Sequence, residues 1–273
     1  MPKSSSPRAT PAAPEDASVD PTRNFGIAIA RAFDILRCFT PERSLLGNSD
    51  LVRLSGLPRS TVSRLAFTLE ELGYLYRLSP IGKYRLGWGV VSLGYPLLTS
   101  MALRHIARPE MHALAARLKV NVNMGTLHRT SVVYLESVHF DETSTTRPDI
   151  GAPRSLLSSA IGRALIWSLD ERRRTALLNR AAIAEPEAFA RTKAKLAQAR
   201  KSLVASGFCL SLGETRQGYS AVSVPMRVVS YEEPIAFNCA TADHRMRKDR
   251  LQNEVGPALV AMVTMLEHRV GIR

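Results

Sequence analysis

The segment from residue 48 to residue 86 constrains the fold of this chain more than any other. Gly56 permits a left-handed backbone at a sharp turn, and Pro58 can begin the next helix because its missing amide proton has no partner there. After this turn, apolar residues recur at helical intervals at Val62, Leu65, Ala66, Leu69 and Leu72. The pattern predicts two helices joined by a tight turn, with one face of the second helix in a core.

The elements around this turn extend the pattern. A first helix begins at one of the polar residues 48–50, any of which can cap it, and ends at Ser55. After the second helix, residues 74–78 and 83–86 are typical of two strands joined by turn formers. An upstream helix at about residues 26–39 is expected to complete the core with Ile29, Phe33, Leu36 and Phe39. This order predicts a winged helix-turn-helix.

Polar and basic side chains occupy the start of the second helix, where an inserted recognition helix meets base edges and phosphates. The strands of the wing add basic residues, Arg85 among them, that could reach neighbouring phosphates. The alternative is an amphipathic helical hairpin whose arginines are merely solvated, but the order of cap, glycine turn and basic hairpin favours DNA. The predicted DNA-binding residues are Arg59, Ser60, Thr61, Ser63, Arg64, Arg77 and Lys83.

Composition sets the remaining limits. A length of 273 residues and 45% hydrophobic residues suit two domains, and a formal charge of +13 favours an anionic partner. Three widely separated cysteines, Cys38, Cys209 and Cys239, indicate neither a disulfide framework nor a zinc site. No apolar run approaches the ~18 residues that span a bilayer. We expect a cytoplasmic protein without a membrane partner, metal or cofactor, and with a disordered tail at residues 1–22.

Beyond the wing, residues 88–119 are predicted to form two helices, the first kinked or interrupted at Pro96 and the second beginning near Pro109. The first helix carries an apolar stripe that packs either on a second copy of the chain or on the chain's own second domain. From Val120 the apolar period changes to that of strands, and helices and strands then alternate up to a last helix at about residues 248–269. This mixed order predicts an α+β domain with an antiparallel sheet flanked by helices.

The whole chain, from about Gly26 to Val270, resembles the IclR (isocitrate-lyase-regulator) family of bacterial transcription regulators. The resemblance rests on a series of motifs in one order: residues 30–36 (ARAFDIL), 56–65 (GLPRSTVSRL), 69–74 (LEELGY), 84–87 (YRLG), 107–109 (ARP), 133–136 (VYLE) and 160–165 (AIGRAL). It implies a winged helix-turn-helix domain at residues 23–87, a linker helix at 88–105 that dimerises, and a GAF-like effector-binding and oligomerisation domain at 106–273. Members act as dimers or tetramers on palindromic operators.

The resemblance also implies a cup in the GAF-like domain that binds a small organic acid. Exposed amides and small hydroxyls at the helix start near residues 158–160 would suit a carboxylate. Where many members have an Asp-Glu-Glu run, this chain has Ser211-Leu212-Gly213-Glu214, so its polar lining is altered. Ordinary capping or strand hydrogen bonding remains the alternative role for each polar residue. The implied effector-binding residues are Ser158, Ser159, Ala160, Ser211, Tyr219, Ala221, Asn238, Cys239 and Thr241.

Tyr219, Phe237 and Ala221 would make the wall of the cup apolar, which favours an acid with an aromatic or otherwise hydrophobic body. Two other functions remain open. One is a DNA-binding repressor that takes no ligand. The other is a small-molecule hydrolase built on the C-terminal domain, although the chain has no Gly-x-Ser-x-Gly elbow, no His-Glu-x-x-His motif and no glycine-rich phosphate loop.

Overall fold

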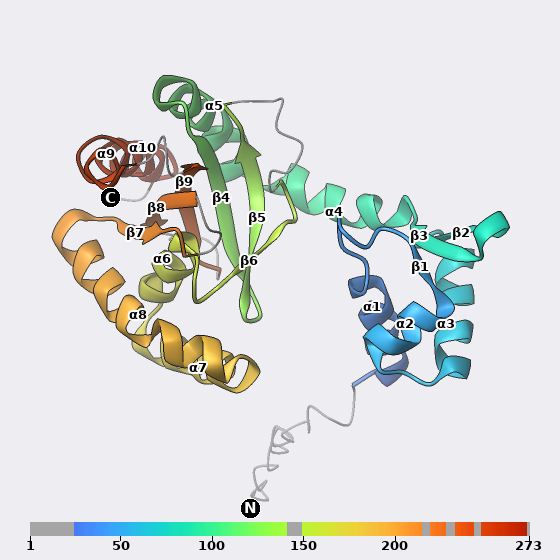
Figure 1. The fold of residues 1–273 in the computed structure, drawn as a ribbon. Coiled ribbons are helices and arrows are strands. Elements are labelled where there is room, and N and C mark those ends of the chain that lie inside the picture. Colours follow the sequence, from blue (N-terminus) through green and yellow to red (C-terminus); the bar gives the residue numbers. More distant parts are fainter. Residues whose placement is uncertain (1–24, 141–148, 215–218, 228–232, 243–246, 272–273) are drawn as a thin grey trace, which may run out of the picture. The chain divides into compact units, whose positions relative to one another are not determined.

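The computed structural model describes residues 25–140, 149–214, 219–227, 233–242 and 247–271 (Figure 1). The chain divides into two compact units between Pro96 and Leu97. The division falls inside the segment 88–105 that the sequence analysis assigns to the linker.

The first unit is a helical domain with a small sheet. Its described elements are α1 (Ile27–Arg37), β1 (Leu46–Gly47), α2 (Asn48–Ser55), α3 (Arg59–Glu71), β2 (Leu75–Leu78), the short 3-10 helix η1 (Ser79–Ile81), β3 (Lys83–Leu86) and the first part of α4 (Gly89–Ser100). β2 and β3 form the predicted antiparallel wing. β1, which the sequence analysis did not predict, pairs with the other edge of β3.

The turn between α2 and α3 has the predicted geometry. Gly56 ends α2 in the left-handed region at φ 69°, and Pro58 immediately precedes α3. Leu51, Val62 and Ala66 are fully buried in the core of the unit, together with Ile35 of α1. The prediction for α1 is partly wrong, because Ile29 and Phe33 are 66% and 46% exposed and lie instead on the wall of an open apolar groove.

The second unit contains a six-stranded antiparallel sheet in the order β6-β5-β4-β9-β8-β7. Its strands are β4 (Asn121–His128), β5 (Ser131–Val138), β6 (Pro153–Ser155), β7 (Cys209–Leu212), β8 (Tyr219–Met226) and β9 (Ile235–Ala242). Its helices are α5 (Ala102–Leu118), α6 (Ala160–Ser168), α7 (Glu171–Ala184), α8 (Pro186–Ser206), α9 (Lys248–Arg250), the π-helix η3 (Leu251–Val255) and α10 (Gly256–Arg269).

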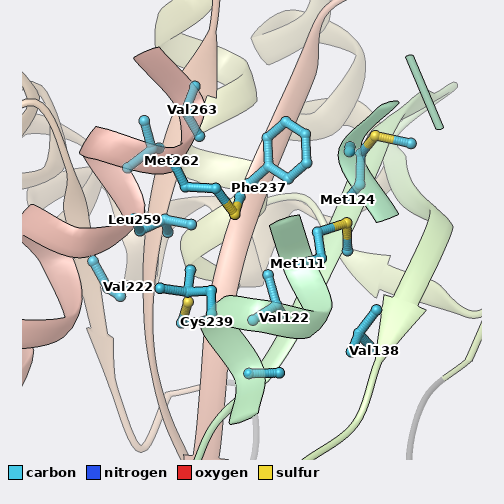
Figure 2. Close-up of a cluster of buried hydrophobic side chains, with 14 of the residues drawn as sticks. Met111, Val122, Met124, Val138, Val222, Phe237, Cys239, Leu259, Met262 and Val263 are labelled. Carbon is cyan, nitrogen blue, oxygen red and sulfur yellow. The ribbon is translucent and has the colours of Figure 1, made fainter. Parts of the chain in front are cut away.

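Two hydrophobic cores lie on opposite faces of this sheet. On one face, α5 and α10 cover Val122, Phe237 and Cys239, which Figure 2 shows among buried side chains of both helices. On the other face, α6 covers Val132 and Tyr134, and α7 and α8 pack outside α6 (Figure 1). We call this second side of the sheet the α6 face. The predicted α+β class is confirmed.

Several element boundaries differ from the sequence analysis. Pro96 lies inside α4, and the helix ends at Ser100. Pro109 lies inside α5, which begins seven residues earlier at Ala102, so the prediction that this helix begins near Pro109 is wrong. The single helix expected at residues 248–269 is interrupted by the π-helix, after which the ring of Phe208 lies against Gly256. The short strand β6 was not predicted.

Candidate DNA-binding and ligand-binding sites

The start of α3 presents the predicted DNA-binding side chains to solvent. Arg59, Ser60, Ser63 and Arg64 are exposed, and Thr61 is half-buried. The guanidinium groups of Arg59 and Arg64 make no hydrogen bond or ion pair with any part of the chain that the structure describes. Because Val62 and Ala66 anchor the opposite side of the helix in the core, the basic side is held outward. Two cations and two small hydroxyls are therefore available to an anionic surface.

A side-chain contact fixes α3 against α2. Asn48 Nδ2 donates a hydrogen bond to Ser63 Oγ over 2.8 Å, so the Ser63 hydroxyl also supports the helix pair. At the start of α2, the Asp50 carboxylate accepts a hydrogen bond of 3.0 Å from the Gly47 amide, as in a capping box. This amide hydrogen bond and then Arg53 hold the pKa of Asp50 below its usual value. The structural role of Asn48 had no signal in the helical periodicity.

The wing uses its basic residues in two ways. Arg77 and Lys83 are exposed on β2 and β3, as the DNA-binding prediction requires, and Arg77 Cζ lies 6.0 Å from the Tyr84 ring centroid. Arg85 instead lies over the rings of Tyr76 and Trp88, with Cζ 4.6 Å and 5.3 Å from the ring centroids. Cation–π contacts of this kind hold the guanidinium against the domain. Arg85 therefore braces the wing.

On the second unit, several of the residues expected in the cup meet on the α6 face. The pairings Ser211↔Ala221 and Ser223↔Asn238 place these side chains in neighbouring rows of the same face. Ser211 Oγ donates a hydrogen bond of 3.3 Å to the Ser158 carbonyl, which joins β7 to the segment before α6. The structure thus brings the predicted strand residues next to the predicted helix start.

The start of α6 uses its hydroxyl for capping. Ser159 Oγ accepts a hydrogen bond of 3.0 Å from the Gly162 amide and donates one of 2.5 Å to the Ser155 carbonyl. In the described part of the chain, the amides of Ala160 and Ile161 donate no hydrogen bond. Ser159 therefore has the ordinary capping role, and the two following amides are the donors that remain.

Gly162 explains why this segment lies so close to α6. A Cβ atom at Gly162 would approach the carbonyl oxygen of Leu156 to 2.1 Å, which no side chain could tolerate. The absence of a side chain lets the backbone of residues 155–159 run directly over the helix.

Other residues from the predicted set lie elsewhere. Cys239 is fully buried on the opposite face, beside Val222 and α10, and Phe237 lies on that face too (Figure 2). Alternation along β9 puts both on the side away from Asn238, so we leave Cys239 out of the site and Phe237 out of its wall. Burial raises the pKa of the Cys239 thiol. Tyr219, two positions before Ala221 at the start of β8, lies on the α6 face with it. Thr241 pairs with Ser220, and its side chain lies outside the described part of the chain.

A buried ion-pair cluster ties the α6 segment to β7. Arg163 is 2% exposed and forms hydrogen bonds with both carboxylate oxygens of Glu214. Arg163 also donates to the carbonyls of Leu157 and Leu210, and Lys195 Nζ lies 2.6 Å from Glu214. Burial acts to raise the pKa of Glu214, but the hydrogen bonds and charges of Arg163 and Lys195 together hold it below its usual value. Glu214 is the one acidic residue in the segment 211–214, where many family members have an Asp-Glu-Glu run.

A second polar cluster lies on the α6 face near its β6 edge. The Arg154 Cζ atom is 5.4 Å from the Tyr134 ring centroid, and the Tyr134 hydroxyl interacts with the side chains of both Arg154 and Asn238. Burial raises the pKa of Tyr134, and these neighbours only partly oppose it. Arg154 and Tyr134 were missed because β6 was not predicted, and a strand residue in the family-like VYLE motif gives no sign of which face it occupies.

The opposite face carries a buried carboxylate. Glu136 is 2% exposed, and its Oε2 lies 2.9 Å from Arg104 Nε on α5 and 3.8 Å from Arg108 Nε. Arg104 also donates a hydrogen bond of 3.5 Å to the carbonyl of Leu98 in α4. The end of α4 and the start of α5 are therefore tied to β5.

Metal-binding clusters and membrane-spanning helices are both absent from the described residues. No group of three His, Cys, Asp or Glu residues there is placed to hold a metal ion. No helix there is both long enough and apolar enough to cross a membrane.

Comparisons with known proteins cover both units. Residues 28–79 match the family described as IclR helix-turn-helix domain, and residues 96–266 match the family described as Bacterial transcriptional regulator IclR C-terminal. The chain is 32% identical to the HTH-type transcriptional regulator TsaQ1/TsaQ2 of Comamonas testosteroni, over 86% of this chain and 85% of that protein.

Solved structures share the fold. An IclR family transcriptional regulator from Brucella abortus is similar with a TM-score of 0.83 and 35% identity, covering 93% of this chain and 96% of that one. An IclR homologue from Microbacterium hydrocarbonoxydans, crystallised with 4-hydroxybenzoate, has a TM-score of 0.65 and 21% identity, covering 88% and 99%. With the helix-turn-helix and the sheet domain both matched, the chain belongs to the IclR family of bacterial transcriptional regulators and is not an enzyme.

Proposed function

We propose that this regulator binds a palindromic operator as a homodimer, or as a tetramer built from dimers, with α3 in the major groove. The exposed start of α3 carries this proposal. Arg59 and Arg64 are available to bases or phosphates, and the wing places Arg77 and Lys83 on the same unit for contacts with the backbone of the duplex.

The apolar side of α4 supports self-association. None of its residues is buried, and Val91, Leu93 and Leu97 are 68%, 56% and 61% exposed. The neighbouring groove of about 410 Å³ on the first unit is lined by Ile29, Phe33 and other apolar residues of α1 and α3. Large exposed apolar surfaces of this kind mark interaction sites, and a second copy supplies the same surface.

Sedimentation and operator binding test this assembly together. Leu97→Glu places a charge on the apolar side of α4 and is expected to shift the protein toward monomer and to lower its affinity for the full palindrome. Affinity for a single half-site should stay nearly unchanged. Only binding to the full palindrome gains from the effective concentration of two linked DNA-binding units, and a monomer loses that gain. Thr99→Glu on the same helix is the matched control. A Leu97→Glu protein that remains dimeric and binds the palindrome fully would place the interface elsewhere.

We further propose that a small organic acid, bound on the α6 face, controls operator binding. The apolar surroundings of this face, including Val132, Tyr134 and Ile161, favour a hydrophobic or aromatic body. Phe237, which the sequence analysis placed in the wall of the cup, lies on the other face and does not contribute to this apolar surface. The 4-hydroxybenzoate complex of the Microbacterium homologue is consistent with such a ligand.

Ligand binding and DNA binding must be measured together. A ligand that binds the native state raises its thermal stability by mass action, and it changes operator affinity only if it binds the two states of the regulator unequally. We expect at least one aromatic acid to do both. A screen in which acids leave both the melting temperature and the operator affinity unchanged would favour the ligand-independent repressor.

A further inference from the structure

Arg154 is a half-buried cation that has no anionic partner among the described residues. It stands opposite Val132 in the β5–β6 pairing, which directs it to the α6 face beside Tyr134. Within the described residues it forms no ion pair with a carboxylate, and its Nε atom is buried without a hydrogen-bond partner. A guanidinium taken from water without an anion costs free energy. An anion bound beside Arg154 would offset this cost.

Asn238, on the same face, has a hydrogen-bond acceptor that lacks a donor. Its side chain is 3% exposed, and the Oδ1 atom is buried without a hydrogen-bond donor. Leaving such an acceptor unsatisfied costs about 1–3 kcal/mol. Because Tyr134 interacts with both Asn238 and Arg154, the three side chains form one connected cluster.

We propose that Arg154, Tyr134 and Asn238 form the polar end of the effector site, and that the effector is an organic acid carrying a hydroxyl group. Arg154 binds the carboxylate, and Asn238 Oδ1 accepts a hydrogen bond from the hydroxyl. This inference rests on the proposed control by an organic acid and names the groups that acid must carry.

Arg154 is a better carboxylate partner than the start of α6. A guanidinium offers charge-assisted, bidentate hydrogen bonds, which are about twice as strong as those from neutral donors. The α6 start offers the Ala160 and Ile161 amides, while the Ser159 hydroxyl is already engaged in capping. The amides can orient a ligand, but only the charge of Arg154 is expected to make an acid bind more tightly than its neutral ester.

Calorimetric titration of the full chain with matched probes tests the proposal. The panel contains hydroxy acids from glycolate to 4-hydroxybenzoate and 4-hydroxycinnamate, each with its parent acid lacking the hydroxyl and with its methyl ester. The hydroxy acid that binds best should lose about tenfold in affinity on losing the hydroxyl, and at least tenfold on esterification, as expected for hydrogen bonds to neutral and charged groups.

Variants separate the two contacts. Arg154→Met should weaken binding of the hydroxy acid at least tenfold and leave binding of its ester unchanged, with Arg154→Lys in between. Asn238→Leu should reduce affinity for the hydroxy acid to that for the parent acid. Arg200→Met is the matched control, because Arg200 also stacks on an aromatic ring, that of Trp167, at 5.3 Å.

The outcomes distinguish this site from the proposed function. Acid binding that survives Arg154→Met, or equal affinity for an acid and its ester, would overturn the Arg154 site and leave control by an acid intact. Equal affinity for hydroxy and parent acids would overturn the role of Asn238. Failure of every acid in the panel to bind the wild-type protein would overturn both the site and the proposed effector class.

Discussion

The start of α3 and the α6 face of the sheet hold their arginine side chains in opposite settings. The guanidinium groups of Arg59 and Arg64 are exposed and have no partner in the described chain, whereas Arg163 is 2% exposed and bonded to Glu214 and backbone carbonyls. A DNA surface must be reached from outside, so its ligands can be exposed at little cost to folding. The proposed small-molecule site would lie within the fold, where buried polar groups such as Arg163 also hold the fold together.

The largest effect that would test this contrast is on stability. Arg163→Met leaves Glu214, whose side chain is 15% exposed, with Lys195 as its remaining charged partner, and should lower the free energy of unfolding by about 3 kcal/mol, near the low end for a broken buried pair. Arg53→Ala removes an ion pair with Asp50 whose side chains are 69% and 39% exposed, and should cost at most about 0.5 kcal/mol. Urea unfolding followed by circular dichroism measures both; equal losses would remove the contrast.

A smaller effect concerns DNA. Arg59→Ala or Arg64→Ala should weaken operator binding by about 1–3 kcal/mol if the side chain reads a base, and should reduce the preference for operator over scrambled DNA. Lys83→Ala, in the wing, should weaken both equally and lower the salt dependence. All three variants should unfold like the wild type. Unchanged affinity in both arginine variants would contradict the assignment of α3 as the recognition helix.

The smallest effect is a change in acid sensitivity. Because the pKa of Glu214 is lowered in the folded protein, its ionised form contributes stability above its ordinary pKa of 4.5, and that contribution is lost as pH falls through the lowered pKa. Wild type and Glu214→Gln should therefore differ in stability at pH 7 and converge toward pH 3. Melting temperatures across this range measure the difference. A constant difference between the two proteins would show that Glu214 acts through packing alone.

The same contrast explains what the sequence could predict. Helical periodicity and the Gly56 turn located α2 and α3 almost to the residue, because a helix face is set by local spacing and its outward residues need no partner. The sheet was harder. A shift of one residue in the register of β9 decides whether Cys239 or Asn238 faces α6. The position of Arg154 could not be predicted, because it lies on β6, a three-residue strand whose pairing with β5 is non-local.

The partners of Arg163 and Glu214 illustrate the same limit. They are separated by 51 positions in the chain and meet because β7 runs beside α6. No local pattern pairs them, although Glu214 was recognisable as the end of an altered acidic run. The hydroxyl of Ser159 shows the opposite case, since ordinary capping was the alternative role and the hydroxyl does cap α6.

Strand β5 carries one residue of each of two polar contacts, the Tyr134–Arg154 contact and the Glu136–Arg104 ion pair. Tyr134 projects to the α6 face, and Glu136, two positions later and past an irregularity in the β4–β5 register, projects to the other face against Arg104. Both residues are paired with β4, opposite Gly125 and Met124, whereas β6 pairs only with the start of β5 at residues 131–133. A short run of β5 therefore joins the polar cluster at Tyr134 to the Glu136–Arg104 ion pair, and Arg104 in turn reaches the carbonyl of Leu98 at the end of α4.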